Sequence, residues 1–270
     1  MSAEGDGTQF TLLGRIDDVD PGLLTRHYTY PDSHPGGGVG SCVVRGNMIA
    51  SVDGGATSSG KSGELGGTGD RAVFGVLREL ADVIVVGAST ARVENYSGVQ
   101  LGAAQRQARR RRGQAEVPPI AVLTRFGSLE RDAQLFHRTD VPPLILTSAD
   151  AVADTTARLG GLAEVLDASG EHPDSVDLRT ALGLLAERGL MRVLTEGGPG
   201  VLGMFTQHDL LDELCLTVAP VLVGGGSGRI VTGPAEVHTP MRLHHALTDD
   251  DGYLYLRYTR RDPPRSGVAR

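Results

Sequence analysis

Apolar residues recur along this chain in two patterns, and together the patterns predict its architecture. Six short runs are mostly apolar, as strands buried in a sheet are. They occupy residues 43–52, 82–87, 120–124, 144–147, 163–166 and 191–195. Other segments space their apolar residues at helical intervals, namely residues 70–80, 151–159, 178–188 and the stretch that follows Pro199. Strands that alternate with helices predict a parallel sheet.

The pattern changes after residue 212. Residues 213–223 alternate as one long strand, interrupted by Pro220, and residues 229–231 add a short strand. Residues 242–247 and 253–260 then flank an Asp-Asp-Asp-Gly turn, which is typical of a hairpin. We therefore expect one α/β domain over residues 43–261, with a mostly parallel central sheet and antiparallel C-terminal strands.

Both ends of the chain lie outside this predicted domain. Residues 1–42 contain scattered apolar residues and end in a glycine-rich run at residues 35–40, which predicts an N-terminal appendage and linker. We expect the appendage to wrap the domain or a partner subunit. Residues 262–270 are expected to form a disordered tail. Because no apolar run approaches the ~18 residues of a membrane span, none is expected.

Composition and charge exclude some functions. Apolar residues make up 40% of the 270 and charged residues 22%, which is ordinary for a soluble globular protein. The net charge of −7 argues against general nucleic-acid binding. Cys42 and Cys215 lack metal-ligand spacing and are interpreted as buried or idle thiols of a cytoplasmic protein. The eight histidines also lack ligand spacing, so no metal is expected.

One basic cluster departs from the acidic balance. It consists of Arg106 and the four consecutive arginines at residues 109–112, in a polar and glutamine-rich stretch. The simplest interpretation is a solvated loop or a fraying helix. The alternative is a contact with a partner or a polyanion.

The stretch at residues 191–203 carries the strongest chemical signal. An apolar strand is followed by Glu196, and then by Gly197-Gly198-Pro199-Gly200 at the start of a predicted helix. Glycines allow a sharp turn and close approach of a ligand, and proline suits the first helical turn. The helix would direct its free N–H groups toward an anion, so we expect a phosphate or pyrophosphate site there. Gly198, Gly200 and Gly203 also match the dinucleotide fingerprint, but the usual ribose-binding acid about 20 residues later is missing, so a Rossmann unit is not expected.

A second motif matches a phosphate-binding loop letter for letter. Residues 55–62 read Gly-Ala-Thr-Ser-Ser-Gly-Lys-Ser, in which Lys61 would contact nucleotide phosphates and Ser62 a magnesium ion. That mechanism needs a helix to begin at the Lys-Ser pair. Four glycines in residues 63–69 each cost a helix roughly 1 kcal/mol relative to alanine, so no helix is expected. A P-loop-type nucleotide phosphotransferase therefore remains an alternative rather than the leading hypothesis.

Four segments in a fixed order carry a resemblance to a known family. They are residues 47–54 (Asn-Met-Ile-Ala-Ser-Val-Asp-Gly), 77–90, 194–199 (Leu-Thr-Glu-Gly-Gly-Pro) and 212–220. The chain resembles the riboflavin-biosynthesis pyrimidine reductase (reductase C-terminal domain) family, which has a dihydrofolate reductase-like fold. The resemblance implies a three-layer α/β/α sandwich, an NADPH-dependent reductase and a homodimer paired through its C-terminal strands. A non-catalytic nucleotide-binding member of the fold is a further alternative.

The resemblance also implies a set of cofactor contacts. Ile49 and Ala50 would border the nicotinamide, and Asp53 would shape the loop that closes over it. The turn that begins at Gly87 would bring Thr90, with Glu94, to the adenosine half. The pyrophosphate would lie on the glycine-rich turn, at Gly197, Gly198, Pro199, Gly200, Val201 and Leu202. Thr124 and Arg125 would bind the 2′-phosphate, since arginine forms forked, charge-assisted hydrogen bonds, or they are surface loop residues.

On the substrate side, the resemblance implies contacts from Ser62, Glu196 and Arg78, although Arg78 could equally lie on the solvated side of its helix. Asp70 opens that helix and either caps it or, as the acid of dihydrofolate reductases does, binds the amidine edge of a pteridine. Residues 94–100 lack the arginine with which the family holds a ribose phosphate. The substrate is therefore expected to be a phosphoribosylaminopyrimidine or a dihydropterin. Asp70 or Glu196 would supply the proton to the acceptor nitrogen.

Overall fold

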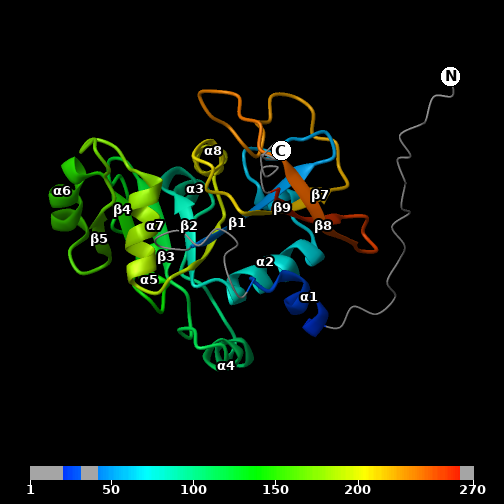
Figure 1. Ribbon diagram of the computed structural model, residues 1–270, viewed down its shortest axis with the longest axis horizontal. Helices are drawn as coiled ribbons and strands as arrows, with labels where there is room; N and C mark the ends of the chain where they lie inside the picture. Colours follow the sequence, from blue (N-terminus) through cyan, green and yellow to red (C-terminus); the bar gives the residue numbers. More distant parts are fainter. Residues whose placement is uncertain (1–20, 32–41, 262–270) are drawn as a thin grey trace, which may run out of the picture.

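The computed structural model describes residues 21–31 and 42–261. Its strands form one sheet in the order β5-β4-β3-β2-β6-β1-β7-β9-β8, with β5 at the left of Figure 1 and β8 at the right. The strands are β1 (Val43–Ser51), β2 (Val83–Gly87), β3 (Ile120–Thr124), β4 (Leu144–Thr147), β5 (Glu164–Asp167), β6 (Arg192–Thr195), β7 (Glu213–Ala219), β8 (Met241–Thr248) and β9 (Leu254–Arg260).

The helices are α1 (Pro21–Tyr28), α2 (Thr68–Leu80), α3 (Ala88–Val93), α4 (Ala103–Arg111), α5 (Gln134–His137), α6 (Ala149–Leu159), α7 (Leu178–Glu187) and α8 (Pro199–Gln207), with a 3₁₀ helix η1 (Gly63–Leu65). In the sheet order, all neighbouring strands from β5 through to β7 pair in parallel. Strand β9 pairs antiparallel with both β7 and β8. The predicted fold class is confirmed.

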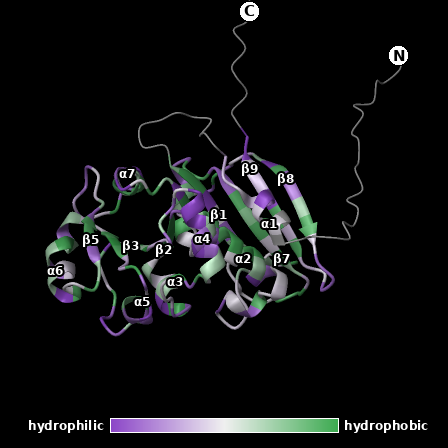
Figure 2. Ribbon diagram, turned by 90° about the horizontal axis from the view of Figure 1, so that it is seen from below, coloured by the Kyte–Doolittle hydropathy of each residue, from purple (hydrophilic) through white to green (hydrophobic). Residues whose placement is uncertain are grey.

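The alternation of side chains in the central strands explains the three layers. In β2, Val83 and Val85 pack into the apolar cluster that contains residues of α7 and α8. Ile84 and Val86 point the other way and pack with residues of α2, α3 and α6. Each central strand is therefore buried on both faces, which accounts for its continuous apolar sequence. In Figure 2, green residues dominate these strands, while α4 is largely purple. None of the described helices is long and apolar enough to cross a membrane.

Three predicted segments differ from the structure. Residues 220–223 and 229–231 belong to no strand, because β7 ends at Ala219, directly before Pro220. Proline has no N–H to donate to a ladder, so the chain leaves the sheet at that point. The arginine-rich segment was expected to be a solvated loop or a fraying helix; it forms the helix α4, with Arg110 and Arg111 exposed but Arg109 fully buried.

The described part of the N-terminal region, residues 21–31, packs against the domain. Helix α1 contacts α2, and Tyr28 and Tyr30 are buried in the core on that face. Arg45 donates from Nη1 to the carbonyl oxygen of Tyr28 at 2.6 Å, and its guanidinium lies 3.8 Å from the ring centre of Tyr30. Tyr30 also donates to the carbonyl oxygen of Val193 at 3.2 Å.

A buried ion triad lies beneath this contact. Glu213 accepts from Arg45 Nε at 2.7 Å and from Arg257 Nη2 at 2.6 Å, and Arg257 donates to the carbonyl oxygen of His27. Residues 27–30 therefore provide acceptors for charges that the sheet buries.

The predicted linker at residues 35–40 and the predicted tail at residues 262–270 lie outside the described residues, and the boundaries drawn at residues 42 and 261 stay predictions. Cys42 and Cys215 are free and buried, as predicted.

Candidate active site

A cavity of about 590 Å³ opens at the carboxyl ends of β2 and β6, beside β1. Such an edge of a parallel sheet is the usual place for a ligand. Its walls come from β1, the glycine-rich loop before α2, α2 itself, α3 with the segment that follows it, and the turn between β6 and α8. Nine of the predicted site residues line it: Ile49, Ser62, Asp70, Arg78, Thr90, Glu94, Glu196, Gly198 and Pro199.

Glu196 follows β6 and is held from two sides. Arg78, in the last turns of α2, donates from Nε to Oε1 and from Nη2 to Oε2, each at 2.6 Å. Tyr96 donates its hydroxyl to Oε2 at 2.7 Å. Burial alone would lower the pKa of Arg78, but the paired carboxylate of Glu196 overrides it and raises that pKa. The pair is a fixed, forked ion pair in the cavity wall.

Aromatic rings complete the surroundings of Arg78. Its guanidinium lies 4.2 Å from the ring centre of Phe74 and 5.5 Å from that of Tyr96. Stacking of this kind holds a guanidinium flat and shields it from water. Arg78 is therefore not on the solvated side of its helix. Burial, followed by the charge of Glu196, raises the pKa of Tyr96 well above its ordinary value, so the phenol stays a hydrogen-bond donor.

Asp70 lies across the cavity, in the first turn of α2. The prediction that it caps this helix is wrong: α2 begins at Thr68 with Gly67 as its N-cap, and no side chain caps it. The glycines before residue 68 allow the helix to start earlier than the apolar spacing indicates. The half-buried carboxyl instead lines the cavity. Its burial raises its pKa, which a hydrogen bond with Thr217 and the charge of Arg71 offset only in part.

Ser62 and Glu94 close the glycine-rich loop onto the end of α3. The backbone N–H and the hydroxyl of Ser62 both donate to Glu94 Oε1, at 2.9 and 2.8 Å. After Lys61 and Ser62 the chain forms only the three-residue helix η1. The helix N-terminus that a phosphate-binding loop requires is missing here, and the Ser62 hydroxyl is bonded to a carboxylate. The letter match at residues 55–62 therefore does not build a P-loop.

The glycine-rich turn after β6 has the geometry that its sequence predicts. Gly197 has a φ of +81°, and its carbonyl oxygen accepts from the N–H of Gly87 at 2.8 Å. The N–H of Gly198 donates to Thr90 Oγ1 at 3.0 Å, and a Cβ at Gly198 would lie only 2.4 Å from that oxygen. Pro199 is the first residue of α8 and lines the cavity, but it has no N–H, so the first N–H groups of that helix are those of Gly200 and Val201, which follow it.

Other members of the predicted cofactor set lie behind this wall. Gly87, Ala50, Gly197 and Leu202 are buried next to it, whereas Gly200 and Val201 are less covered, and none of these six residues lines the cavity. A Cβ at Gly203 would lie 1.8 Å from the carbonyl oxygen of Thr232, so this third fingerprint glycine serves helix packing.

Three further predicted cofactor residues do not line the cavity. Asp53 accepts from Ser51 Oγ and from the N–H groups of Val223 and Gly224, and these bonds lower its pKa to about 2. It therefore ties the loop after β7 to the end of β1. Thr124 is buried at the end of β3, and the exposed Arg125 pairs with Asp174 at 2.5 Å. Neither Thr124 nor Arg125 reaches the cavity.

Sequence reasoning missed several residues of the cavity wall. Tyr96, Phe74 and Asn47 line it, and Thr217 supports Asp70 from β7. Phe74 had a signal, because it lies one helical turn before Arg78. Tyr96 had none in its own neighbourhood, since its partner is 100 residues away. Within the described residues, no three His, Cys, Asp or Glu side chains gather as a metal site would require.

Comparisons with known proteins agree with this geometry. The chain is 29% identical over 178 residues to the riboflavin biosynthesis protein RibD of Bacillus amyloliquefaciens, and the match covers 65% of this chain and 45% of that protein. It is 29% identical over 181 residues to the 2,5-diamino-6-ribosylamino-4(3H)-pyrimidinone 5′-phosphate reductase of Aquifex aeolicus, covering 65% of this chain and 75% of that one. The chain thus spans less than half of the RibD relative.

A solved structure gives the same result. A pyrimidine reductase-like protein from Corynebacterium diphtheriae superposes with a TM-score of 0.73 at 27% identity, over 82% of this chain and 93% of that one. The sequence model of the RibD C-terminal domain matches residues 43–255. That match covers more than half of the chain, from β1 into β9. The chain belongs to the RibD C-terminal domain family.

Proposed function

We propose that the protein is an NADPH-dependent reductase of a pyrimidine or pteridine heterocycle. The observation that carries the proposal is one cavity with a glycine-rich turn at a helix N-terminus on one wall and a carboxyl with a raised pKa, Asp70, on another. The chain's family supports it, since a relative in Aquifex aeolicus is named as a reductase of a ribosylaminopyrimidinone phosphate.

The glycine-rich turn fits a pyrophosphate. A Cβ at Gly198 would lie 2.4 Å from Thr90 Oγ1, so glycine is what allows the turn and the Thr90 side chain to lie together in the cavity wall. The first turn of α8 supplies N–H groups without helical partners, and the helix dipole favours negative charge there. Gly198, Pro199 and Thr90 would hold NADPH. When bound, NADPH supplies the hydride, and the protein orients the acceptor and excludes water.

The structure favours Asp70 over Glu196 as the proton donor. Both oxygens of Glu196 already accept hydrogen bonds from Arg78 and Tyr96, so this carboxylate holds the wall together. Asp70 is half-buried, and burial raises its pKa, so it keeps a proton more readily than an exposed aspartate. We assign to Asp70 the delivery of a proton to the acceptor nitrogen, directly or through a water molecule.

Two cavity residues favour different heterocycles. A carboxyl at the position of Asp70 suits the amidine edge of a dihydropterin, which it binds by paired hydrogen bonds. The exposed Arg71 also lines the cavity and donates only a long hydrogen bond, 3.4 Å, to Thr68 Oγ1. A substrate phosphate would find a counter-charge there. The choice between a phosphoribosylaminopyrimidine and a dihydropterin therefore depends on which residue binds the ring's substituents.

Steady-state oxidation of NADPH tests the proposal. Purified protein is mixed with NADPH and either a dihydropterin or a phosphoribosylaminopyrimidine, and the fall in NADPH absorbance is followed. Turnover with one of them is expected. NADPH binding without turnover of either would favour a non-catalytic member of the fold. Binding of ATP with magnesium but not NADPH would favour the phosphotransferase and would refute the proposal.

We also propose a homodimer paired through the C-terminal strands, in the cytoplasm as two free thiols favour. Strand β8 forms an edge of the sheet, and Leu243 on it is 43% exposed. An exposed apolar side chain on an open strand edge favours association. Sedimentation velocity should give twice the monomer mass, and Leu243→Glu should shift it toward the monomer. A monomeric wild-type protein would contradict the pairing.

A further inference from the structure

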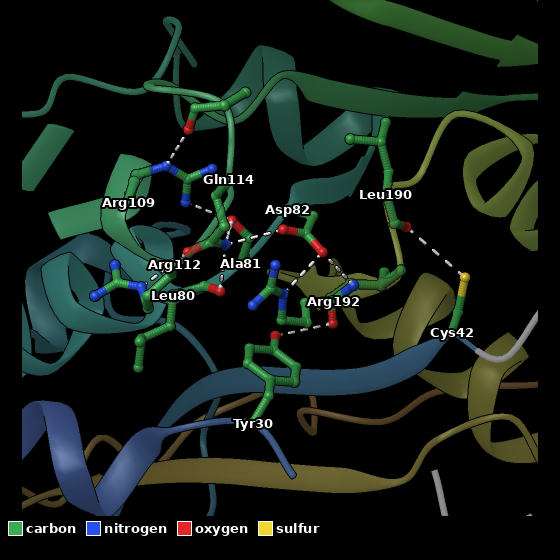
Figure 3. A network of polar contacts seen from close by, with 12 residues as sticks. Tyr30, Cys42, Leu80, Ala81, Asp82, Arg109, Arg112, Gln114, Leu190 and Arg192 are labelled. Carbon is green, nitrogen blue, oxygen red and sulfur yellow. Dashed lines mark hydrogen bonds and ion pairs between the residues drawn. The ribbon is translucent and has the colours of Figure 1, made fainter. Parts of the chain in front are cut away.

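The arginine-rich segment holds the end of the helix that carries Asp70 and Arg78. Arg109 of α4 is fully buried, and its Nη1 donates to the carbonyl oxygens of Glu79 at 2.7 Å and Ala81 at 2.6 Å (Figure 3). Its Nε donates to the carbonyl oxygen of Ala115 at 2.7 Å. The last carbonyls of a helix lack helical partners and carry the negative end of its dipole. Arg109 therefore acts as a cationic cap at the C-terminus of α2.

Gln114 reinforces the same helix end. Its Nε2 donates to the carbonyl oxygen of Leu80 at 3.0 Å and to Asp82 Oδ1 at 2.9 Å. Arg112 adds an ion pair to Glu79 at 3.0 Å. Figure 3 shows Arg109, Arg112 and Gln114 gathered around Leu80, Ala81 and Asp82. These contacts fix the chain where α2 ends and β2 begins.

Asp82 extends the network to β6. Its Oδ2 accepts from the backbone N–H and from Nε of Arg192, both at 2.9 Å, and its own N–H donates to the carbonyl oxygen of Arg192 at 2.7 Å. Arg192 is the first residue of β6, and Glu196 follows the last one. The network therefore joins the end of α2 to the start of the strand that leads into the cavity.

The same two elements bring Arg78 and Glu196 together. Arg78 directly precedes Glu79, whose carbonyl oxygen Arg109 holds, and Glu196 comes four residues after Arg192. We propose that Arg109 and Gln114 are positioning residues of the active site, which set α2 against β6 so that Arg78 meets Glu196 in the cavity wall. The kinetic part of this inference rests on the proposed reductase function.

The acceptors around Arg109 explain why an arginine is needed at this position. Arg109 is buried without a carboxylate in hydrogen-bond contact, and burial lowers its pKa to about 10. The carbonyl oxygens must offset that burial, and a planar guanidinium reaches three of them at once. A lysine ammonium is a compact point charge and cannot span the same acceptors. Arg109→Lys therefore keeps the positive charge but removes the planar group that reaches all three carbonyl oxygens.

The experiment compares Arg109→Lys with Arg110→Lys. Arg110 is the next residue on α4, but it is exposed and pairs only with Glu116 at the surface. The first readout is the Nε–H signal of Arg78 in a ¹H–¹⁵N spectrum, assigned by its loss in Arg78→Lys. It should broaden in Arg109→Lys and stay sharp in Arg110→Lys. The second is kcat/KM for the heterocycle, which should fall about tenfold in Arg109→Lys, as for one lost charge-assisted hydrogen bond, with Kd for NADPH unchanged.

A double-mutant cycle separates positioning from general stability. In a Glu196→Gln background the ion pair is already weakened, so Arg109→Lys should reduce kcat/KM much less than in the wild type. An equal reduction in both backgrounds, or an unchanged Arg78 signal, would overturn the inference. Gln114→Met repeats the test if Arg109→Lys fails to fold. If the wild type turns over neither heterocycle, the proposed function fails, whereas the Arg78 signal still decides the inference.

Discussion

Replacing Asp70 by asparagine tests the assignment of the proton donor. The substitution keeps the size and the ability to hydrogen-bond but removes the transferable proton. General acid catalysis by a positioned side chain contributes about 10²–10⁴-fold, so kcat for the heterocycle should fall by that factor. The glycine-rich turn, which we propose binds the pyrophosphate, contributes Gly198 and Pro199 to another wall of the cavity, so Kd for NADPH should stay unchanged. Steady-state kinetics and fluorescence titration measure the two effects.

The pH profile gives a second readout of the same residue. Asp70 donates only when protonated, and burial raises its pKa. In the wild type kcat/KM should therefore decline as the pH rises through this raised pKa, and the decline should disappear in Asp70→Asn. Glu64→Gln is the matched control, since Glu64 is exposed in the adjacent 3₁₀ helix and is not part of the cavity wall. Unchanged turnover in Asp70→Asn would refute the assignment.

Asp70→Asn should lower turnover but raise the thermal stability of the protein at neutral pH. The folded protein holds the proton of Asp70 more tightly than the unfolded chain, because the folded-state pKa is raised. The resulting stabilisation is fully present below the unfolded pKa and is lost as the pH rises through the folded pKa. At neutral pH the charged carboxylate is a burden on the fold, so Asp70→Asn should unfold at a higher temperature than the wild type. A lower Tm at neutral pH would contradict this reasoning.

Two further predictions follow from packing and charge. Gly198→Ala should weaken NADPH binding about tenfold or more, because its Cβ would lie 2.4 Å from Thr90 Oγ1, whereas Gly200→Ala meets no atom within 4 Å and should bind normally. Equal affinities in a titration would contradict the placement of the pyrophosphate. Glu213→Gln breaks the buried triad and should cost about 3–5 kcal/mol of unfolding free energy, whereas the exposed Glu164→Gln should cost at most about 1. Urea unfolding measures both, and similar costs would show that the triad is not effectively buried.

Most of the fold was predictable because its signals are local. The β2 strand is apolar at every position since both its faces are buried, and such runs predicted β2, β3, β4 and β6. Residues 229–231 were predicted wrongly for a related reason. They look like a short strand, but a strand needs a partner, and this segment follows a proline that has already taken the chain out of the sheet.

The site divides in the same way. The glycine-rich turn was recognisable because Glu196, Gly197, Gly198 and Pro199 are consecutive, and each has a local backbone reason to be there. Tyr96 was not, because its role depends on a carboxylate that only the sheet topology brings near. The burial of Arg109 was also not predictable from its sequence neighbourhood. A run of arginines looks solvated, and nothing near it in sequence reveals that helix carbonyls 28 and 30 residues earlier will surround one of them.

The docking of residues 27–30 has a consequence for anyone who shortens this protein. The family match begins at residue 43, so a version trimmed to that boundary would look complete by sequence. It would lack three carbonyl oxygens: that of Tyr28, which accepts from Arg45, and those of His27 and Thr29, which accept from Arg257. The guanidiniums of Arg45 and Arg257 would then keep Glu213 but lose the carbonyl oxygens of that segment. The face of the sheet that Tyr30 covers would be exposed to solvent. The packed core therefore includes residues that precede the family match.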